Sequence, residues 1–249
     1  MHLPPKKFTQ NAISCNDCSL NKICLPNGLS EQEIKQLESI IDKTTKLKKK
    51  DIVFKSNDEI TGVYAVKSGS IKTSISNANG QEQVLEFHLP GDMFGFDAFN
   101  VNIHICDAVA LEDTFICKIP IDAFDNLCNQ FPNLRKEMRH QVGKEIEHNQ
   151  RLLLALGQQQ TDERLASFLL QISNHFQARG FSSKEFSLPM PRQDLSNYLG
   201  MAVETLSRII SRMTENGLIQ IDHRVVHIVD NDKLQLLANS SCSTKKSLV

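Results

Sequence analysis

Three cysteines near the amino terminus, Cys15, Cys18 and Cys24, have the C-x2-C-x5-C spacing of metal ligands. One tight turn can direct the sulfurs of Cys15 and Cys18 to the same centre, and thiolates are soft ligands that suit iron-sulfur clusters or zinc. A four-ligand site needs a further ligand from elsewhere in the chain. The remaining cysteines are Cys106, Cys117, Cys128 and Cys242. The residues alone therefore predict a metal site whose fourth ligand is not assigned.

A second group of residues has the chemistry of DNA recognition. Glu204, Ser207 and Arg208 are spaced i, i+3 and i+4, so they share one face of a helix. Arg208 can donate two hydrogen bonds to guanine, Glu204 can accept from a base amino group, and Ser207 can contact a base or a thymine methyl. The alternative is a surface ion pair between Glu204 and Arg208, worth about 0.3 kcal/mol.

The elements around this group favour a helix-turn-helix. A short helix from Arg192 would end at Gly200, and a second helix would begin at Val203. Two apolar runs on either side of Asp222-His223-Arg224 predict a hairpin, so the unit is a winged helix-turn-helix. Three arginines could contact phosphates or could be ordinary surface residues. They are Arg192, Arg212 and Arg224.

A long helix after Phe131-Pro132 carries a seam with alternating spacings of four and three. This pattern predicts a parallel homodimer, in which a polar residue, Asn149, helps to set the register and weakens the dimer. The alternative is a helix packed only on its own chain. The seam residues are Val142, Ile146, Asn149, Leu153 and Leu156.

The region between Ile52 and Pro120 reads as short strands separated by glycines, with a hairpin turn at Asn79-Gly80. Such strands predict a small β-barrel or roll. Before it, Ser30 and Glu33 form a capping box that predicts a short helix within residues 29–42. The lysines of residues 46–50 could form a nucleic-acid patch, but a solvated turn before the strand at residues 52–54 is the expectation.

Composition narrows the function. The chain has 249 residues and a formal net charge of -1, so DNA binding must come from locally placed cations. Seven cysteines without a secretory leader favour metal ligands and free thiols, in the cytoplasm, over disulfides. The longest apolar run, residues 152–156, cannot span a membrane. Because no nucleophile-base constellation, P-loop or dinucleotide fingerprint occurs, an enzyme is not expected.

Together these residues resemble the CRP/FNR superfamily of bacterial transcription factors, in particular its oxygen-sensing FNR branch. The likeness extends over nearly the whole chain and is carried by the cysteine cluster and four other segments. These are residues 63–72 (VYAVKSGSIK), 90–97 (PGDMFGFD), 115–120 (FICKIP) and 198–208 (YLGMAVETLSR).

The resemblance implies that a 4Fe-4S cluster is held by Cys15, Cys18, Cys24 and Cys117. It also implies that Glu204, Ser207 and Arg208 read a half-site in near-palindromic double-stranded DNA, and that the homodimer acts on promoters with RNA polymerase. Oxygen would convert 4Fe-4S to 2Fe-2S, loosen the dimer and release the DNA. Zinc on the same thiolates, or no cofactor, is the alternative.

Two features qualify the resemblance. In this family the position of Asn149 often carries an acidic residue that opposes dimerisation without a cluster, so we expect weaker oxygen control here. Relatives that bind a cyclic nucleotide hold its phosphate with an arginine in the roll. From Thr73 to Cys117 the chain has no Lys or Arg and seven acidic residues. No cyclic nucleotide is therefore expected.

The expected fold class is α+β, with an amino-terminal β-roll (a jelly roll like that of cyclic-nucleotide-binding domains), a long dimerisation helix and a carboxy-terminal winged helix-turn-helix. The expected domains are a cluster-binding segment (1–30), a β-roll sensor domain (31–130), the dimerisation helix (131–158) and a DNA-binding domain (159–249).

Overall fold

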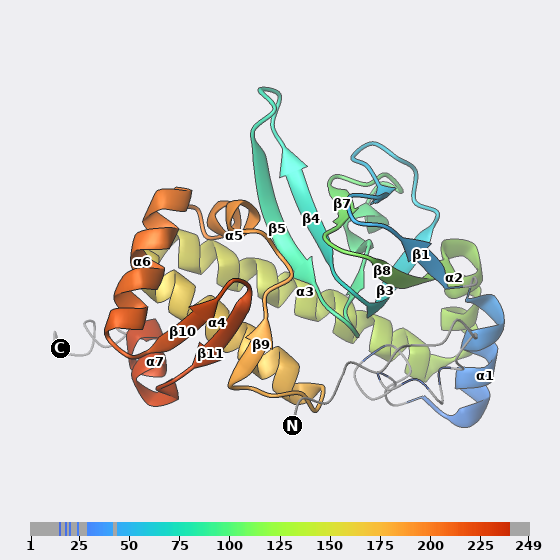
Figure 1. Ribbon diagram of the computed structural model, residues 1–249. Helices are drawn as coiled ribbons and strands as arrows, with labels where there is room; N and C mark the ends of the chain where they lie inside the picture. Colours follow the sequence, from blue (N-terminus) through green and yellow to red (C-terminus); the bar gives the residue numbers. More distant parts are fainter. Residues whose placement is uncertain are drawn as a thin grey trace, which may run out of the picture.

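The computed structural model describes Cys15, Cys18, Leu20, Cys24 and residues 29–41 and 44–239. Cys242 lies outside these residues. Figure 1 shows a β-rich half and a helical half that are joined along one long helix, α3 (Pro132–Gln158).

The amino-terminal half is a roll of two four-stranded antiparallel sheets, with strand orders β1-β8-β3-β6 and β2-β7-β4-β5. A short 3-10 turn, η1 (Phe96–Phe99), follows β6. The expected β-roll is therefore confirmed. Its strands are β1 (Thr45–Leu47), β2 (Ile52–Phe54), β3 (Gly62–Ser68), β4 (Ile71–Ser76), β5 (Glu82–His88), β6 (Met93–Phe94), β7 (Asp107–Ala110) and β8 (Thr114–Pro120).

The β4–β5 hairpin turns at the predicted Asn79-Gly80. Gly80 has a φ of +76°, and the Asn77 side chain accepts hydrogen bonds from the N–H groups of Asn79 (2.9 Å) and Gln81 (3.0 Å). The hairpin projects well beyond the rest of the roll (Figure 1). Inside the roll, Phe54, Tyr64 and Phe94 pack against one another with ring centroids 5.3 to 6.1 Å apart, so aromatic side chains fill the interior.

Helices bracket the roll. The predicted helix is α1 (Glu31–Ile40), and its capping box is formed as expected: the Ser30 hydroxyl accepts from the Glu33 N–H and the Glu33 carboxylate accepts from the Ser30 N–H. Proline at its first position starts α3 where predicted. The sequence did not indicate α2 (Ile121–Gln130), which packs against both α1 and α3.

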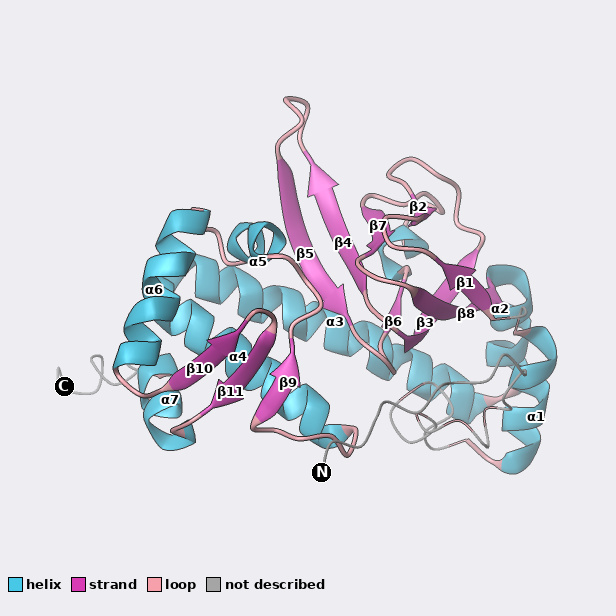
Figure 2. Cartoon of the chain, viewed as in Figure 1, coloured by secondary structure: helices cyan, strands magenta, loops and turns pink. Residues whose placement is uncertain are grey.

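The carboxy-terminal half is a helical unit with a small sheet in the order β10-β11-β9 (Figure 2). Its predicted winged helix-turn-helix is confirmed, whereas β9 and α7 were not anticipated. The elements are α4 (Thr161–Ala178), β9 (Glu185–Ser187), α5 (Arg192–Tyr198), α6 (Val203–Glu215), β10 (Ile219–Asp222), β11 (Val225–Ile228) and α7 (Asn231–Ala238).

Candidate metal centre and nucleic-acid interface

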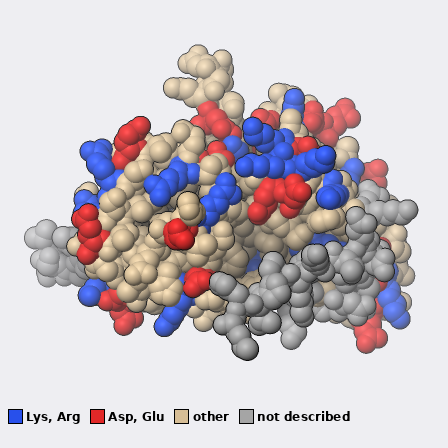
Figure 3. All heavy atoms as spheres, in the orientation of Figure 1, with Lys and Arg blue, Asp and Glu red and all other residues tan. Residues whose placement is uncertain are grey.

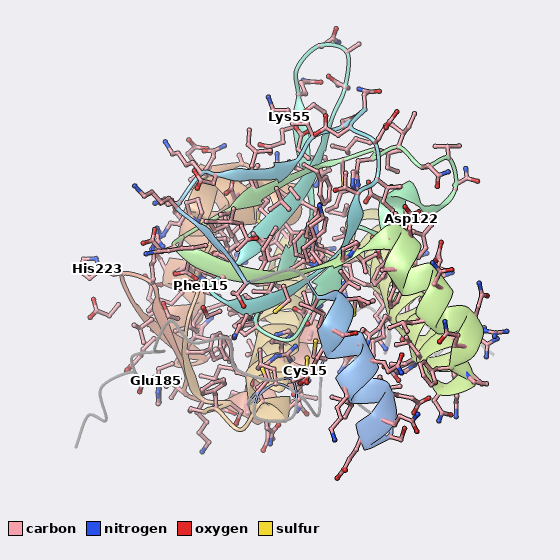
Figure 4. The ribbon with its side chains drawn as sticks, turned by 90° about the vertical axis from the view of Figure 1, so that its right-hand side faces the viewer. Cys15, Lys55, Phe115, Asp122, Glu185 and His223 are labelled. Carbon is pink, nitrogen blue, oxygen red and sulfur yellow. The ribbon has the colours of Figure 1, made fainter. Side chains whose placement is uncertain are left out.

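Cys15, Cys18, Cys24 and Cys117 line one pocket between α1 and the roll. The Cys18 N–H donates to the Cys15 carbonyl oxygen over 3.3 Å, which is the tight turn that the C-x2-C spacing predicts. The Cys15 N–H donates to the Glu38 carboxylate of α1, and Figure 4 shows Cys15 beside this helix. Cys117 lies on β8. The fold therefore brings together cysteines from two distant segments.

The thiols of this pocket influence one another. Burial, with smaller contributions from the Glu38 carboxylate, Cys117 and Cys18, raises the pKa of Cys15 to about 12. Burial also raises the pKa of Cys117; Lys67 opposes this rise and Cys18 adds to it. The sulfurs of Cys15, Cys18 and Cys117 are thus close enough for one thiolate to oppose the ionisation of another. A bound cation would remove that opposition, because metal ligands bind as thiolates.

Among the described residues, the rest of the pocket wall is apolar except for one cation, Lys67. Soft donors in an apolar pocket fit an iron-sulfur cluster, and a set of four cysteines also fits zinc. In the described part of the chain, no three Cys, His, Asp or Glu side chains already form a metal-binding group. The other lining residues are Leu20, Leu37, Ile41, Ala65, Val66 and Ile119.

The pocket is continuous with an apolar core that reaches α3. We call this the α1–α3 core; Leu37, Phe124 and Leu134 are fully buried in it. Cys24 and Cys117 pack against it from the pocket side, and Met138 and Val142 pack against it from α3. A change in the cysteine pocket can therefore be transmitted by side-chain packing to the first half of α3.

Two other cysteines are buried in apolar surroundings. Cys106 lies in the interior of the roll, where its thiol donates to Asp97 over 3.3 Å, and Cys128 lies in the α1–α3 core. Neither lines the cysteine pocket. Both have the character of small buried hydrophobic residues that the sequence analysis expected.

The helix-turn-helix is formed by α5 and α6, which are joined at Gly200. This glycine has a φ of +61°, and a Cβ there would lie only 2.8 Å from a Leu156 methyl and 3.1 Å from the Arg164 guanidinium. The positive φ favours glycine at this position, and a larger residue would also displace the ends of the Leu156 and Arg164 side chains. Inward-facing residues predicted from the sequence are buried. They include Leu195, Ser196, Leu199, Leu206, Ile209, Ile210 and Met213.

The outer face of α6 carries Glu204, Ser207 and Arg208, as predicted. Glu204 and Arg208 are exposed and Ser207 is partly exposed. The Arg208 guanidinium donates to the Thr205 hydroxyl over 3.3 Å, and the described residues contain no ion pair between Glu204 and Arg208. The alternative of a surface ion pair is thus not formed, and these polar groups can reach bases in a major groove.

The three candidate phosphate contacts are placed differently. Arg192 and Arg224 are exposed; Arg192 donates to the Ser207 hydroxyl (3.5 Å) and Arg224 to the Pro189 carbonyl oxygen (3.1 Å). Arg212 pairs with Asp162 of α4 at 3.1 Å, which would compete with a phosphate. The face in Figure 3 carries mixed charges, with basic side chains gathered over the roll beside acidic ones and separate cations over the helical half.

The predicted seam of α3 divides into three parts. Val142 packs on the α1–α3 core, and Leu156 packs against the turn glycine of the helix-turn-helix. Between them, Asn149 is exposed, and Ile146 and Leu153 expose 53% and 73% of their surface. Apolar side chains this exposed on a long helix are suited to contact with a second helix.

The roll also contacts the helix-turn-helix directly, which the sequence did not reveal. The Lys72 ammonium lies 2.9 Å from Glu82 and 3.1 Å from Asp194 of α5. The Asn197 side chain accepts from the Val84 N–H (2.6 Å) and donates to the Glu82 carbonyl oxygen (2.7 Å). These polar pairs lie far apart in sequence, and no local pattern marks them. They fix α5 on the edge strand β5.

A second contact joins the loop after β5 to α4. The Arg179 guanidinium, which is almost buried, pairs with Asp92 at 2.7 Å. Nearby, burial lowers the pKa of His88 to about 4 and that of His175 to about 3, so both imidazoles are neutral near pH 7. The junction between roll and DNA-binding half is thus partly polar and closely packed.

A β-roll, a long helix and a winged helix-turn-helix with an exposed polar recognition face define a DNA-binding transcription regulator. Comparisons with known sequences agree. The cyclic nucleotide-binding domain family matches residues 44–131, and the Crp-like helix-turn-helix domain family matches residues 163–237.

Curated relatives are similar over almost their full length. The anaerobic regulatory protein of Haemophilus influenzae is 40% identical over 238 residues, covering 96% of this chain and 92% of the relative. The fumarate and nitrate reduction regulatory protein of Escherichia coli is 40% identical over 227 residues, covering 91% of each. The chain belongs to the CRP/FNR superfamily and is of the FNR type. It is a regulator and not an enzyme.

Solved structures show the same fold. FixK2 from Bradyrhizobium japonicum aligns with a TM-score of 0.72 and 25% identity, over 78% of this chain and 96% of that structure. A mutant of CooA from Carboxydothermus hydrogenoformans aligns with a TM-score of 0.66 and 21% identity, over 85% of this chain and 91% of that one. In the part of the chain that the structure describes, no helix has the length and apolarity needed to cross a membrane.

Proposed function

We propose that this protein is an oxygen-responsive transcription regulator that binds near-palindromic DNA as a homodimer when Cys15, Cys18, Cys24 and Cys117 hold a 4Fe-4S cluster. The observation that carries this proposal is the convergence of four cysteines on one apolar pocket. The names of the curated relatives, which refer to anaerobic regulation and to fumarate and nitrate reduction, support it.

The cluster, when bound, supplies an oxygen-labile link between the amino-terminal cysteines and β8. The chain's own residues carry the effect onward. Cys24 and Cys117 pack on the α1–α3 core, and Val142 packs on the same core from α3. One helical turn later the exposed seam begins at Ile146. A looser pocket would therefore loosen the seam and separate the two recognition helices, which must be held one DNA turn apart to bind a palindrome.

Cyclic-nucleotide control is not favoured, although a family of that name matches the roll. Phe54, Tyr64 and Phe94 fill the interior of the roll, and from Thr73 to Cys117 no Lys or Arg is available to hold a phosphate. Structural zinc is the second candidate, because four thiolates also satisfy zinc. In that case DNA binding would not depend on oxygen.

Anaerobic purification tests the proposal. We expect a brown protein with iron and acid-labile sulfide that binds a duplex with a near-palindromic site. On exposure to air, the visible absorption should fall, and DNA affinity and dimer content should fall with it. A colourless protein that contains zinc and binds DNA equally well in air would reject the oxygen sensor and leave a DNA-binding regulator.

Activation or repression needs a separate measurement. We expect the cluster-loaded dimer to alter transcription by purified RNA polymerase from a promoter that carries the binding site. The same reaction after exposure to air should return to the level seen without the regulator. DNA binding without any change in transcript level would contradict a role with RNA polymerase.

A further inference from the structure

Lys67 occupies an unusual place in β3. In the pairing of β3 with β8, Ala65 faces Cys117 and Val66 faces Ile116, but the next pair is Ser68 with Phe115. Lys67 is therefore the additional residue of a β-bulge, two residues beyond the partner of Cys117. Bulges of this kind redirect a side chain and are common beside functional sites.

The bulge leaves Lys67 in the wall of the cysteine pocket. Among the described lining residues it is the only one with a charged side chain. A partly buried lysine in an otherwise apolar wall is costly unless an anion compensates for it.

Thr44 connects Lys67 to the pocket. The Lys67 ammonium lies 3.5 Å from the Thr44 hydroxyl oxygen, to which it can donate. The Thr44 hydroxyl in turn donates to the sulfur of Cys117. The cation and the hydroxyl thus form a chain of donors that ends on a proposed metal ligand. Hydrogen bonds to ligand sulfurs, together with net charge, tune the stability of such centres.

The charge of the proposed centre explains why a cation belongs here. Four thiolates around an iron-sulfur core of charge about +2, or around one zinc ion, leave a net charge of about -2. In an apolar pocket that charge is poorly solvated, and a neighbouring ammonium lowers the energy of the loaded state.

We propose that Lys67 is the counter-cation of the centre held by the four cysteines, and that Thr44 extends its effect to Cys117. Lys67 is a positioning and charge-compensating residue and is not a ligand. The inference rests on the proposed function in requiring a metal centre in this pocket, but it holds for iron and for zinc alike.

Retention of metal under strictly anaerobic conditions tests this inference without any DNA-binding assay. The full-length protein would be loaded, and metal transfer to a chelator followed by absorption. We expect Lys67→Met to lose metal about 10-fold faster than wild type, and Lys67→Arg to stay near wild type because it keeps the charge. Thr44→Val, which removes the donor but keeps the shape, should lie between the wild type and Lys67→Met.

Lys46→Met is the matched control, since Lys46 is an exposed lysine on β1, the strand paired with β8, and its ammonium lies over the Phe115 ring and not in the pocket. It should retain metal like wild type. Thermal unfolding of the metal-free variants checks that the roll is intact. Equal retention by Lys67→Met and wild type would overturn the inference, and so would equally fast loss from Lys67→Met and Lys67→Arg.

The outcome for the wild type separates the two proposals. Iron in the wild type with no effect of Lys67→Met overturns the counter-cation and leaves the oxygen sensor standing. Zinc in place of iron, with faster loss from Lys67→Met, overturns the oxygen sensor and supports the counter-cation. A wild type that takes up neither metal overturns both.

Discussion

The cysteine pocket and the helix-turn-helix differ in whether they need a bound ligand to be stable. In the helix-turn-helix, Leu206 and Met213 are almost fully buried, the turn is closed by Gly200, and the polar face of α6 is exposed and ready to bind. In the pocket, burial and mutual repulsion raise the pKa of Cys15 and Cys117. The helix-turn-helix is fully formed without a ligand, whereas a bound cation would stabilise the cysteine pocket by favouring its thiolates.

This difference shows where control can be applied. A preformed recognition face is always available to one half-site, so it cannot respond to a signal by folding. The pocket can respond, because a bound centre would change the packing of the α1–α3 core beneath α3. Under the proposed function, regulation would act on the distance between the two recognition helices of the dimer and leave the structure of each helix unchanged.

The largest effect should come from Cys117→Ser. A serine hydroxyl ionises far less readily than a thiol and is a poor ligand for iron or zinc, so stable cluster binding should be abolished. Iron and sulfide content after anaerobic purification measures this loss. The helix-turn-helix should stay folded, with an unchanged unfolding transition for the carboxy-terminal half.

The matched control for that variant is Cys128→Ala, which removes a buried cysteine from the α1–α3 core but not from the pocket. It should keep its cluster at some cost in stability. A full cluster in the Cys117→Ser variant would place the fourth ligand elsewhere. The cysteine pocket would then not be the ligand-dependent region that the comparison with the helix-turn-helix requires.

How far the sequence predicts each region follows from the range of the interactions involved. Periodicity and capping are local, so the start of α3, the capping box of α1 and the inward positions of α6 were predictable. The recognition face was predictable for the same reason, and Arg208 lies where its spacing placed it. That these residues contact DNA bases stays a prediction.

The elements that were missed depend on contacts between distant residues. Strand β9 is only three residues long and exists because it pairs with β11. The Lys72–Asp194 and Asp92–Arg179 pairs cross between the two halves. Lys67 reaches the pocket through a bulge, which a strict alternation of strand residues cannot indicate. The fourth ligand was likewise open from the residues alone.

The junction between the two regions should weaken in acid. The buried His88 has a pKa of about 4, below its ordinary value of 6.5, so the unfolded chain binds a proton that the folded chain does not. Above pH 6.5 His88 is neutral in both the folded and the unfolded chain, so it does not change the free energy of unfolding. As the pH falls from 6.5 towards 4, protonation of the unfolded chain lowers that free energy. The loss is about 3 kcal/mol for this residue.

Urea unfolding of the metal-free protein between pH 7 and pH 4 measures this effect against His88→Gln. The pKa values of Glu86 and Asp92 are raised by burial, so these carboxyls oppose the trend in both proteins. The difference between wild type and variant therefore isolates His88. Parallel curves would show that His88 does not carry the pH dependence.

Arg208→Ala tests the recognition face and should leave the cysteine pocket unchanged. We expect a cost of about 1 to 3 kcal/mol at a site with guanine at the contacted position, and reduced discrimination there. Competition binding with single-base variants of the site measures it. Arg212→Ala is the comparison: as a candidate phosphate contact it should weaken binding to all sequences alike, and only slightly because its side chain is paired with Asp162. A uniform loss for Arg208→Ala would make it a phosphate contact.

The smallest effect should come from Asn149→Asp, in the exposed part of the seam that connects the two regions. In a parallel dimer the two carboxylates would face each other, and repulsion of about 1 kcal/mol should raise the dissociation constant of the cluster-free dimer about fivefold. Analytical ultracentrifugation at low and high salt measures it, and salt should reduce the difference. The control is Gln158→Glu, an exposed position off the seam. Equal dissociation constants for wild type and Asn149→Asp would show that the neutral amide does not help the cluster-free protein to dimerise. The expectation of weaker oxygen control would then lose its basis.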